Sequence, residues 1–329
     1  MASSLLQPPT NIHPATALRL SQQAPSLLGQ NRSSLTSSLP LSFFSSESPD
    51  TWTIYENLLL SCLRTRDDES ARQCLEKLTT RFGESNERVM GLKGMYSEAT
   101  AENHAALGEI LKEYEGILAD DPTNAPISKR RVALLRSSSR TNEAITALVE
   151  LLDSSPTDAE AWSELSDLYF SQKSYPQAIF SLEEVLLIVP NAWNIHARLG
   201  EITYISGITT SSDGSAATEN ERGPLTDSIR SFCRSIELCD DYLRGYYGLK
   251  LATSRLLTLH SSSSSAVSSS SSKEMSSKEL EKLNELATAK LAEIVRRSSA
   301  GEKGWTGYDQ AEVIAARELL DRDSKSVER

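Results

Sequence analysis

The chain is poor in the residues and motifs that build catalytic and metal sites. It has only 4 histidines, which lie far apart at His13, His104, His196 and His260. None of them stands at a metal-binding spacing from a second ligand. The sequence also contains neither a glycine-rich phosphate loop nor a Gly-x-Ser-x-Gly motif. We therefore predict a protein that is not an enzyme and that holds no metal and no cofactor.

Long apolar runs and an excess of positive charge are missing as well. No stretch approaches the roughly 18 to 20 consecutive apolar residues that a spanning helix needs, so no direct membrane span is expected. The formal net charge of -11 disfavours nucleic acid as a partner of the whole chain. The 4 cysteines stand in no metal-ligand or redox spacing, which favours a reducing compartment.

Three prolines indicate an internal repeat. Pro122, Pro156 and Pro190 follow one another at equal intervals of 34 residues, each between two stretches of helix-forming residues. This interval is the unit length of tetratricopeptide repeats, which are helical hairpins that must stack to bury their apolar faces. The sequence therefore predicts an all-α protein, a tetratricopeptide-repeat solenoid in which the hairpins form a right-handed superhelix.

The repeat that begins at Ala159 contains the side chains that hairpin packing requires. Trp162, Leu165 and Tyr169 fall on one face of its first helix. Ala178 supplies the small residue where the second helix crosses the first closely. We predict that these four residues, together with the three prolines, occupy the packing positions of the repeats.

The composition changes at both ends of the chain and at two internal segments. Residues 1–48 are rich in Ser, Leu and Pro, which predicts a disordered leader; the lack of acidic residues in the first 46 residues also resembles an organelle transit peptide. The solenoid is expected over residues 49–299, with insertions at 209–223 and at 260–277. The second insertion contains a serine run and should be a flexible loop. Residues 300–329 are expected to form a charged, loosely held tail.

The first helices of such hairpins line a concave groove, and side chains between their packing positions project into it. We predict that partner proteins bind there through two sets of residues. The groove should run from basic to acidic, and its aromatic side chains are of the kind found at interface hot spots. A solvated helix face is the alternative interpretation of the basic set. The predicted binding residues are Lys129, Arg130 and Arg136 in the basic set, and Asp167, Phe170, Glu201 and Tyr204 in the other.

Several phrases of the sequence together resemble one known family. They are a leading YENLL at 55–59, DPTN at 121–124, SKRR at 128–131, EAWSEL at 160–165 and YPQA at 175–178. Their order is similar to that of subunit 2 of the endoplasmic reticulum membrane protein complex, and the resemblance covers most of residues 50–300. The chain departs from that pattern in its long leader, in the insertion after Ile208 and in the serine run.

The resemblance implies a non-catalytic scaffold, peripheral to the endoplasmic reticulum membrane on its cytoplasmic face, in a complex that inserts tail-anchored and multipass proteins. The partners implied are a cytosolic subunit with a metalloprotease-like but inactive fold and cytosolic segments of membrane-embedded subunits. The alternative is a generic tetratricopeptide adaptor in another assembly, such as a chaperone or ubiquitin-ligase scaffold. An enzyme subunit with a catalytic groove is a third, remote reading.

Overall fold

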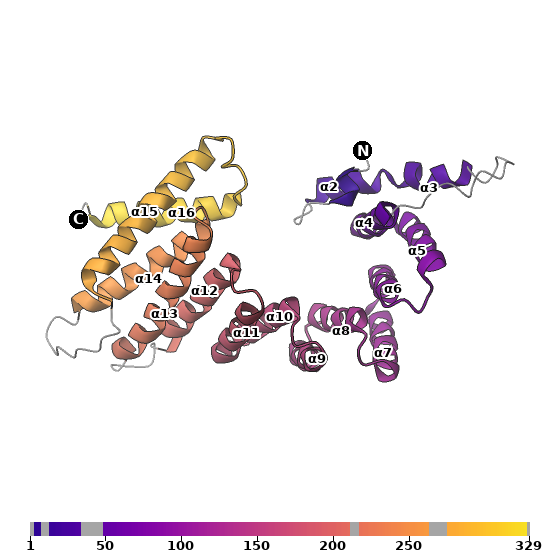
Figure 1. The fold of residues 1–329 in the computed structure, drawn as a ribbon, viewed down its shortest axis with the longest axis horizontal. Coiled ribbons are helices and arrows are strands. Elements are labelled where there is room, and N and C mark those ends of the chain that lie inside the picture. The colour runs from indigo at the N-terminus through magenta and orange to yellow at the C-terminus, as the bar shows by residue number, and fades with distance from the viewer. Residues whose placement is uncertain (1–2, 8–12, 34–48, 211–216, 263–274, 328–329) are drawn as a thin grey trace. The chain divides into compact units, whose positions relative to one another are not determined.

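The computed structural model describes residues 3–7, 13–33, 49–210, 217–262 and 275–327. Within these ranges all regular structure is α-helical, and successive helices form hairpins (Figure 1). The all-α fold of helical hairpins that the proline spacing predicts is thereby confirmed. The chain divides into two compact units, Met1–Pro156 and Thr157–Arg329, each with its own apolar core.

The first unit begins with short helices that pack on a longer hairpin. One core of this unit lies among α1 to α6, where Leu58 and Leu59 are completely buried and the thiols of Cys62 and Cys74 face inward. The helices of this unit are α1 (Ser3–Leu6), α2 (Pro14–Ser21), α3 (Ala24–Ser33), α4 (Pro49–Thr65), α5 (Asp68–Phe82), α6 (Glu87–Thr100), α7 (His104–Asp120), α8 (Ala125–Ser137) and α9 (Thr141–Ser154).

The second unit has its largest core at the C-terminal end, among α12 to α16. Leu249 and Ala252 of α14 and Leu291 of α15 are fully buried there. Its helices are α10 (Ala159–Ser171), α11 (Tyr175–Ile188), α12 (Trp193–Thr210), α13 (Ala217–Leu238), α14 (Leu243–Ser262), α15 (Ser277–Ser299) and α16 (Gln310–Val327).

The turns between hairpins have a constant design. Pro122, Pro156 and Pro190 each stand two residues after a second helix and three residues before the next first helix, where the missing proline N–H breaks no helical hydrogen bond. Asn124 and Asp158 then cap α8 and α10: each accepts a hydrogen bond at 3.1 Å from the backbone N–H three residues further on. Such caps stabilise a helix by about 1 kcal/mol. The sequence therefore dictates where each hairpin begins.

The residues predicted to pack the hairpin α10–α11 lie at its crossing. Leu165 and Ala178 are buried, whereas Trp162 and Tyr169 are half-buried. The Trp162 ring contacts Phe180 of α11 edge to face, with 6.1 Å between ring centroids. Where the two helices come closest, the buried hydroxyl of Ser166 donates to the carbonyl oxygen of Ala178 at 2.8 Å.

The leader differs from the disordered segment that the sequence predicts, because it contains the helices α2 (Pro14–Ser21) and α3 (Ala24–Ser33). Its prolines stand where helices tolerate them: Pro14 begins α2 and Pro25 lies in the first turn of α3. Leu20 of α2 is almost completely buried against the core of the first unit. Leu5 is held too, since its carbonyl oxygen accepts a hydrogen bond from Nδ2 of Asn57 at 2.7 Å. Residues 34–48 of the predicted leader lie outside the described residues.

The predicted insertion at 209–223 is largely taken up by the two long helices that flank it. Helix α12 continues to Thr210 and α13 begins at Ala217, while residues 211–216 lie outside the described residues. Glu221 of α13 is 3% exposed and accepts two hydrogen bonds from the guanidinium of Arg255, at 3.0 and 3.1 Å. The second half of this segment is therefore fastened to α14.

The C-terminal tail also differs from the loosely held segment expected, because it forms α16. Val313, Ala316 and Leu319 recur at helical spacing and are buried against the core of the second unit. Ahead of this helix, the Tyr308 hydroxyl donates to the carbonyl oxygen of Asp241 at 2.9 Å. The tail was expected to be loosely held because charged residues surround these apolar positions in the sequence. Of the predicted serine loop, residues 263–274 lie outside the described residues.

Candidate functional site

Three of the predicted binding residues of the second unit meet around a side chain that the sequence analysis did not name, Arg198 of α12. One guanidinium nitrogen of Arg198 donates to Asp167 of α10 and the other to Glu201 of α12, both at 2.9 Å. The guanidinium carbon also lies 4.7 Å from the centroid of the Phe170 ring, in a cation–π contact. Arg198 thus joins the first helices of two successive hairpins into one polar and aromatic surface.

The fourth predicted residue of this unit, Tyr204, lines a cavity of about 390 Å³ beside that surface. We call it the Arg198 cavity. It lies between the first helices α12 and α14, and the start of α16 contributes one side. At its edge, Nε of Arg244 donates to Oε1 of Glu312 at 2.7 Å. Its main lining side chains are Arg198, Glu201, Tyr204, Phe232, Tyr242, Arg244, Tyr247 and Glu312.

The apolar end of the Arg198 cavity depends on a glycine of α14. A Cβ atom on Gly248 would lie 2.1 Å from Cζ of Phe232, far inside van der Waals contact. On α12, a Cβ on Gly200 would lie 3.1 Å from atoms of the same ring. Phe232, on α13, therefore packs between two helices that come close only because both present glycine.

Burial and pairing fix the charges around the cavity. Burial alone would lower the pKa of Arg198, but the hydrogen bonds to Glu201 and Asp167 raise it above its usual value, so the guanidinium stays charged. Burial raises the pKa of Tyr204 and of Tyr242, and both hydroxyls are therefore neutral donors at physiological pH. The site can offer aromatic faces, hydroxyl donors and paired charges to a peptide.

The predicted basic set lies in the first unit, and Arg130 has an internal role there. Its Nε donates to Oε1 of Glu98 of α6 at 3.0 Å, and Nη2 pairs with the other carboxylate oxygen. The Tyr114 hydroxyl of α7 donates to the same Glu98 at 2.6 Å. Burial, then the hydrogen bond to Glu98, raises the pKa of Tyr114, so this hydroxyl stays protonated. Arg130 and Tyr114 thus bind the same carboxylate, which connects α6, α7 and α8.

The other two basic residues are more accessible. Lys129 is half-buried and Arg136, in the last turn of α8, is exposed. The third member of the basic run, Arg131, donates through Nη1 to Glu150 of α9 at 2.7 Å. Of the predicted basic set, Arg130 is therefore paired inside its own unit, whereas three residues of the other set meet around Arg198.

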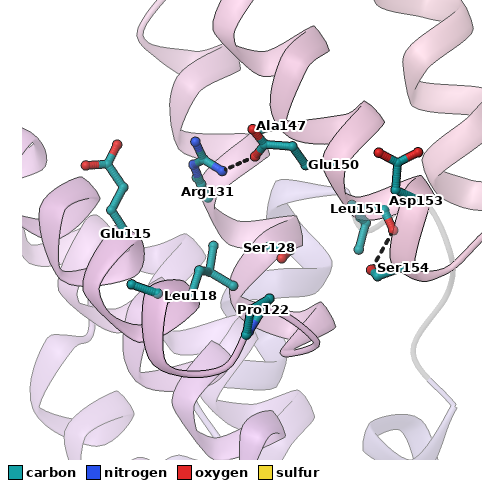
Figure 2. A pocket seen from close by; sticks show the side chains of 11 residues that line it. Glu115, Leu118, Pro122, Ser128, Arg131, Ala147, Glu150, Leu151, Asp153 and Ser154 are labelled. Carbon is teal, nitrogen blue, oxygen red and sulfur yellow. Dashed lines mark hydrogen bonds and ion pairs between the residues drawn. The ribbon is translucent and has the colours of Figure 1, made fainter.

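The first unit has a larger cavity, of about 600 Å³, enclosed by α7, α8 and α9. Figure 2 shows Glu115 on one side of it and Glu150 and Asp153 on the other, with Arg131 between them. Leu118, Pro122 and Leu151 add an apolar floor. We call this the Arg131 cavity; nothing in the sequence analysis pointed to it beyond the proline.

The described ranges lack the clusters of side chains that bind metal ions. No group of three or more His, Cys, Asp and Glu side chains there could hold a metal ion. Burial raises the pKa of Cys62 and of Cys74 to about 12, which keeps both thiols protonated and unreactive. No helix in these ranges combines the length and apolar character that a bilayer crossing requires.

Sequence reasoning missed Arg198, Arg244 and Glu312. Arg198 carried one local signal, since Glu201 stands three residues later on the same helix face. Arg244 and Glu312 are 68 residues apart and carried none, because Glu312 belongs to the segment expected to be loosely held. The position of Tyr242, in contrast, could be inferred from the repeat spacing, which places it among the aromatic residues of the groove.

Comparison with known proteins gives consistent matches. A family model described as the EMC2 TPR-like repeat domain matches residues 85–216. The TPR repeat protein oca3 of Schizosaccharomyces pombe is 35% identical over 208 residues, which are 63% of this chain and 68% of that protein. The ER membrane protein complex subunit 2-A of Xenopus laevis is 32% identical over 215 residues, 65% of this chain and 66% of that protein. Among solved structures, the C-terminal part of a TPR repeat-containing protein from Cytophaga hutchinsonii aligns with a TM-score of 0.49 and 12% identity, over 84% of this chain and 93% of that one.

Proposed function

Because the chain belongs to the EMC2 family of tetratricopeptide-repeat proteins, we propose that it is a non-catalytic scaffold subunit of the endoplasmic reticulum membrane protein complex. In this proposal it sits peripherally on the cytoplasmic face of the membrane and holds other subunits together. It thereby supports the insertion of tail-anchored and multipass proteins. Its partners are a cytosolic metalloprotease-like subunit and cytosolic segments of the membrane-embedded subunits.

The Arg198 cavity is the observation that supports the holding role most directly. Its walls combine tyrosine rings with ion pairs that are already formed, Arg198 with Glu201 and Arg244 with Glu312. Rings that are held in place lose little conformational entropy when a partner covers them, which is why tyrosine and arginine recur at interface hot spots. The site offers contact area and hydrogen bonds rather than a nucleophile beside a base.

The predicted binding residues divide in this proposal. Asp167, Phe170, Glu201 and Tyr204 surround or line one site, and Arg198 joins them as the side chain that positions the two carboxylates. Of the basic set, Lys129 and Arg136 remain candidates for contact with a partner. Arg130 contributes to the proposal only by holding its own unit together.

Affinity purification of the tagged full chain from detergent-solubilised membranes tests this function. We expect the chain to sediment with endoplasmic reticulum membranes and to bring along the other subunits of the complex in stoichiometric amounts. Recovery in free cytosol or nucleus, with a chaperone or ubiquitin-ligase assembly and without those subunits, would overturn the proposal in favour of a generic adaptor.

A further inference from the structure

The Arg131 cavity of the first unit takes no part in the function proposed above. It is formed by the C-terminal halves of α7 and α9 and by the start of α8 (Figure 2). Because α7 and α9 are second helices of successive hairpins, the cavity opens on the second-helix side, away from the face that the first helices present. It is therefore a separate place at which the chain can meet another molecule.

The charges of this cavity are unbalanced. Arg131 is the one cationic side chain among the described residues that line it, and its partner is Glu150, at 2.7 Å. Asp153 makes no hydrogen bond or ion pair through its carboxylate in the described part of the chain. Glu115 lies near Lys112 and Arg140, but those two cations form their ion pairs with other carboxylates, Glu109 and Glu143.

The cavity already contains one guanidinium group, that of Arg131. The side chain of Arg131 is 24% exposed and lies between the two acidic walls. Beneath it, Leu151 is buried and Leu118 is half-buried, while Pro122 is exposed at the edge. A second cationic side chain would find, on either side of Arg131, a carboxylate without an ion pair for its head, and an apolar floor for its methylene stem.

We propose that the Arg131 cavity binds a short basic segment of a partner protein, an arginine or lysine with an aliphatic neighbour. The cation pairs with Glu115 or with Asp153, beside Arg131, and the aliphatic side chain covers Leu118 and Pro122. Charge complementarity selects this occupant, because an acidic segment would add a further negative charge to a lining that carries three carboxylates and one guanidinium.

Fluorescence anisotropy with the purified full chain tests the proposal. The probe is a fluorescein-labelled peptide of alternating leucine and arginine, compared with one of alternating leucine and glutamate. The charge variant is Glu115→Gln with Asp153→Asn. Its matched control is Glu87→Gln with Glu113→Gln, which removes the same charge from exposed positions of the first unit that do not line the cavity.

We expect the basic peptide to bind, and the charge variant to weaken it about tenfold, since each carboxylate contributes one partly exposed ion pair. The control should change the affinity less than about twofold, and raised salt should reduce the difference between variant and unaltered chain. The control is essential because a chain of net charge -11 attracts any cation to some extent.

A second variant blocks the space without changing charge. Ala119 is exposed and lines the cavity, so Ala119→Trp should leave the thermal unfolding temperature unchanged and weaken the basic peptide about tenfold. The proposal is overturned if Ala119→Trp binds like the unaltered chain, if the control weakens binding as much as the charge variant, or if the acidic peptide binds equally well.

Discussion

Replacing Glu98 by glutamine should loosen the first unit, because this carboxylate joins three helices. It lies on α6 and accepts hydrogen bonds from the Tyr114 hydroxyl of α7 at 2.6 Å and from Nε of Arg130 of α8 at 3.0 Å. Glutamine has nearly the same size and can still accept from Tyr114. What it removes is the negative charge opposite a guanidinium that cannot lose its proton.

The expected magnitude follows from the burial of the pair. Breaking a fully buried ion pair costs about 3–5 kcal/mol, because the remaining charge is left without compensation, whereas an exposed pair is worth at most about 1 kcal/mol. The side chains of Arg130 and Glu98 are 24% and 14% exposed, which is closer to the buried limit. We therefore expect Glu98→Gln to lower the local free energy of unfolding by about 2–3 kcal/mol.

Hydrogen exchange followed by mass spectrometry measures this effect unit by unit. A loss of about 2–3 kcal/mol accelerates the exchange of protected amides in residues 87–137 by about 30- to 150-fold, and amides of the second unit should not change. The control is Glu109→Gln, whose pair with Lys112 has side chains 74% and 69% exposed. Unchanged exchange in residues 87–137, or an equal acceleration in the control, would refute the reasoning.

Two further predictions concern close packing and thiol chemistry. Gly248→Ala should lower the free energy of unfolding of the second unit by about 1–3 kcal/mol, because the new Cβ would lie 2.1 Å from Phe232. Gly108→Ala is the control: its Cβ would have no neighbour within 4 Å, so it should raise the free energy of unfolding by about 0.5–1 kcal/mol. Thermal unfolding measures both effects. Cys62 and Cys74, each with a pKa of about 12, are protonated at pH 8 and should react with a thiol reagent only after denaturant is added; rapid labelling of both in the native chain would contradict their burial.

The hairpins of the middle of the chain could be predicted because their signals are local. The proline interval fixed the unit length, and large apolar residues opposite Ala178 fixed the face on which each helix packs. The helices of the leader and of the tail were harder to predict, because their local signals are weak. Pro14 lowers the expectation of helix anywhere except in a first turn, and that is where it stands; the buried face of α16 is narrow, and charged residues such as Glu312, Arg317 and Glu318 are interspersed with it.

The ion-pair partners of charged side chains could not be predicted, because these partners lie far away in the sequence. Lys129, Arg130 and Arg131 are consecutive, yet Arg130 reaches Glu98, 32 residues earlier, and Arg131 reaches Glu150, 19 residues later. Helical periodicity places the three on different sides of α8 but does not say what each side meets. The cluster around Arg198 was found only in part for the same reason.

In the proposed function, the chain holds a partner protein at the Arg198 cavity. Its most direct test is quantitative co-purification from solubilised membranes with a variant that blocks the cavity at two exposed lining positions, Asn194→Trp with Glu201→Lys. The control carries the same types of change at exposed positions of the second helices α11 and α13, Gln177→Trp with Glu237→Lys. We expect the blocked variant to stay folded and to lose other subunits of the complex, while the control retains them. Full recovery of those subunits with the blocked variant would contradict it.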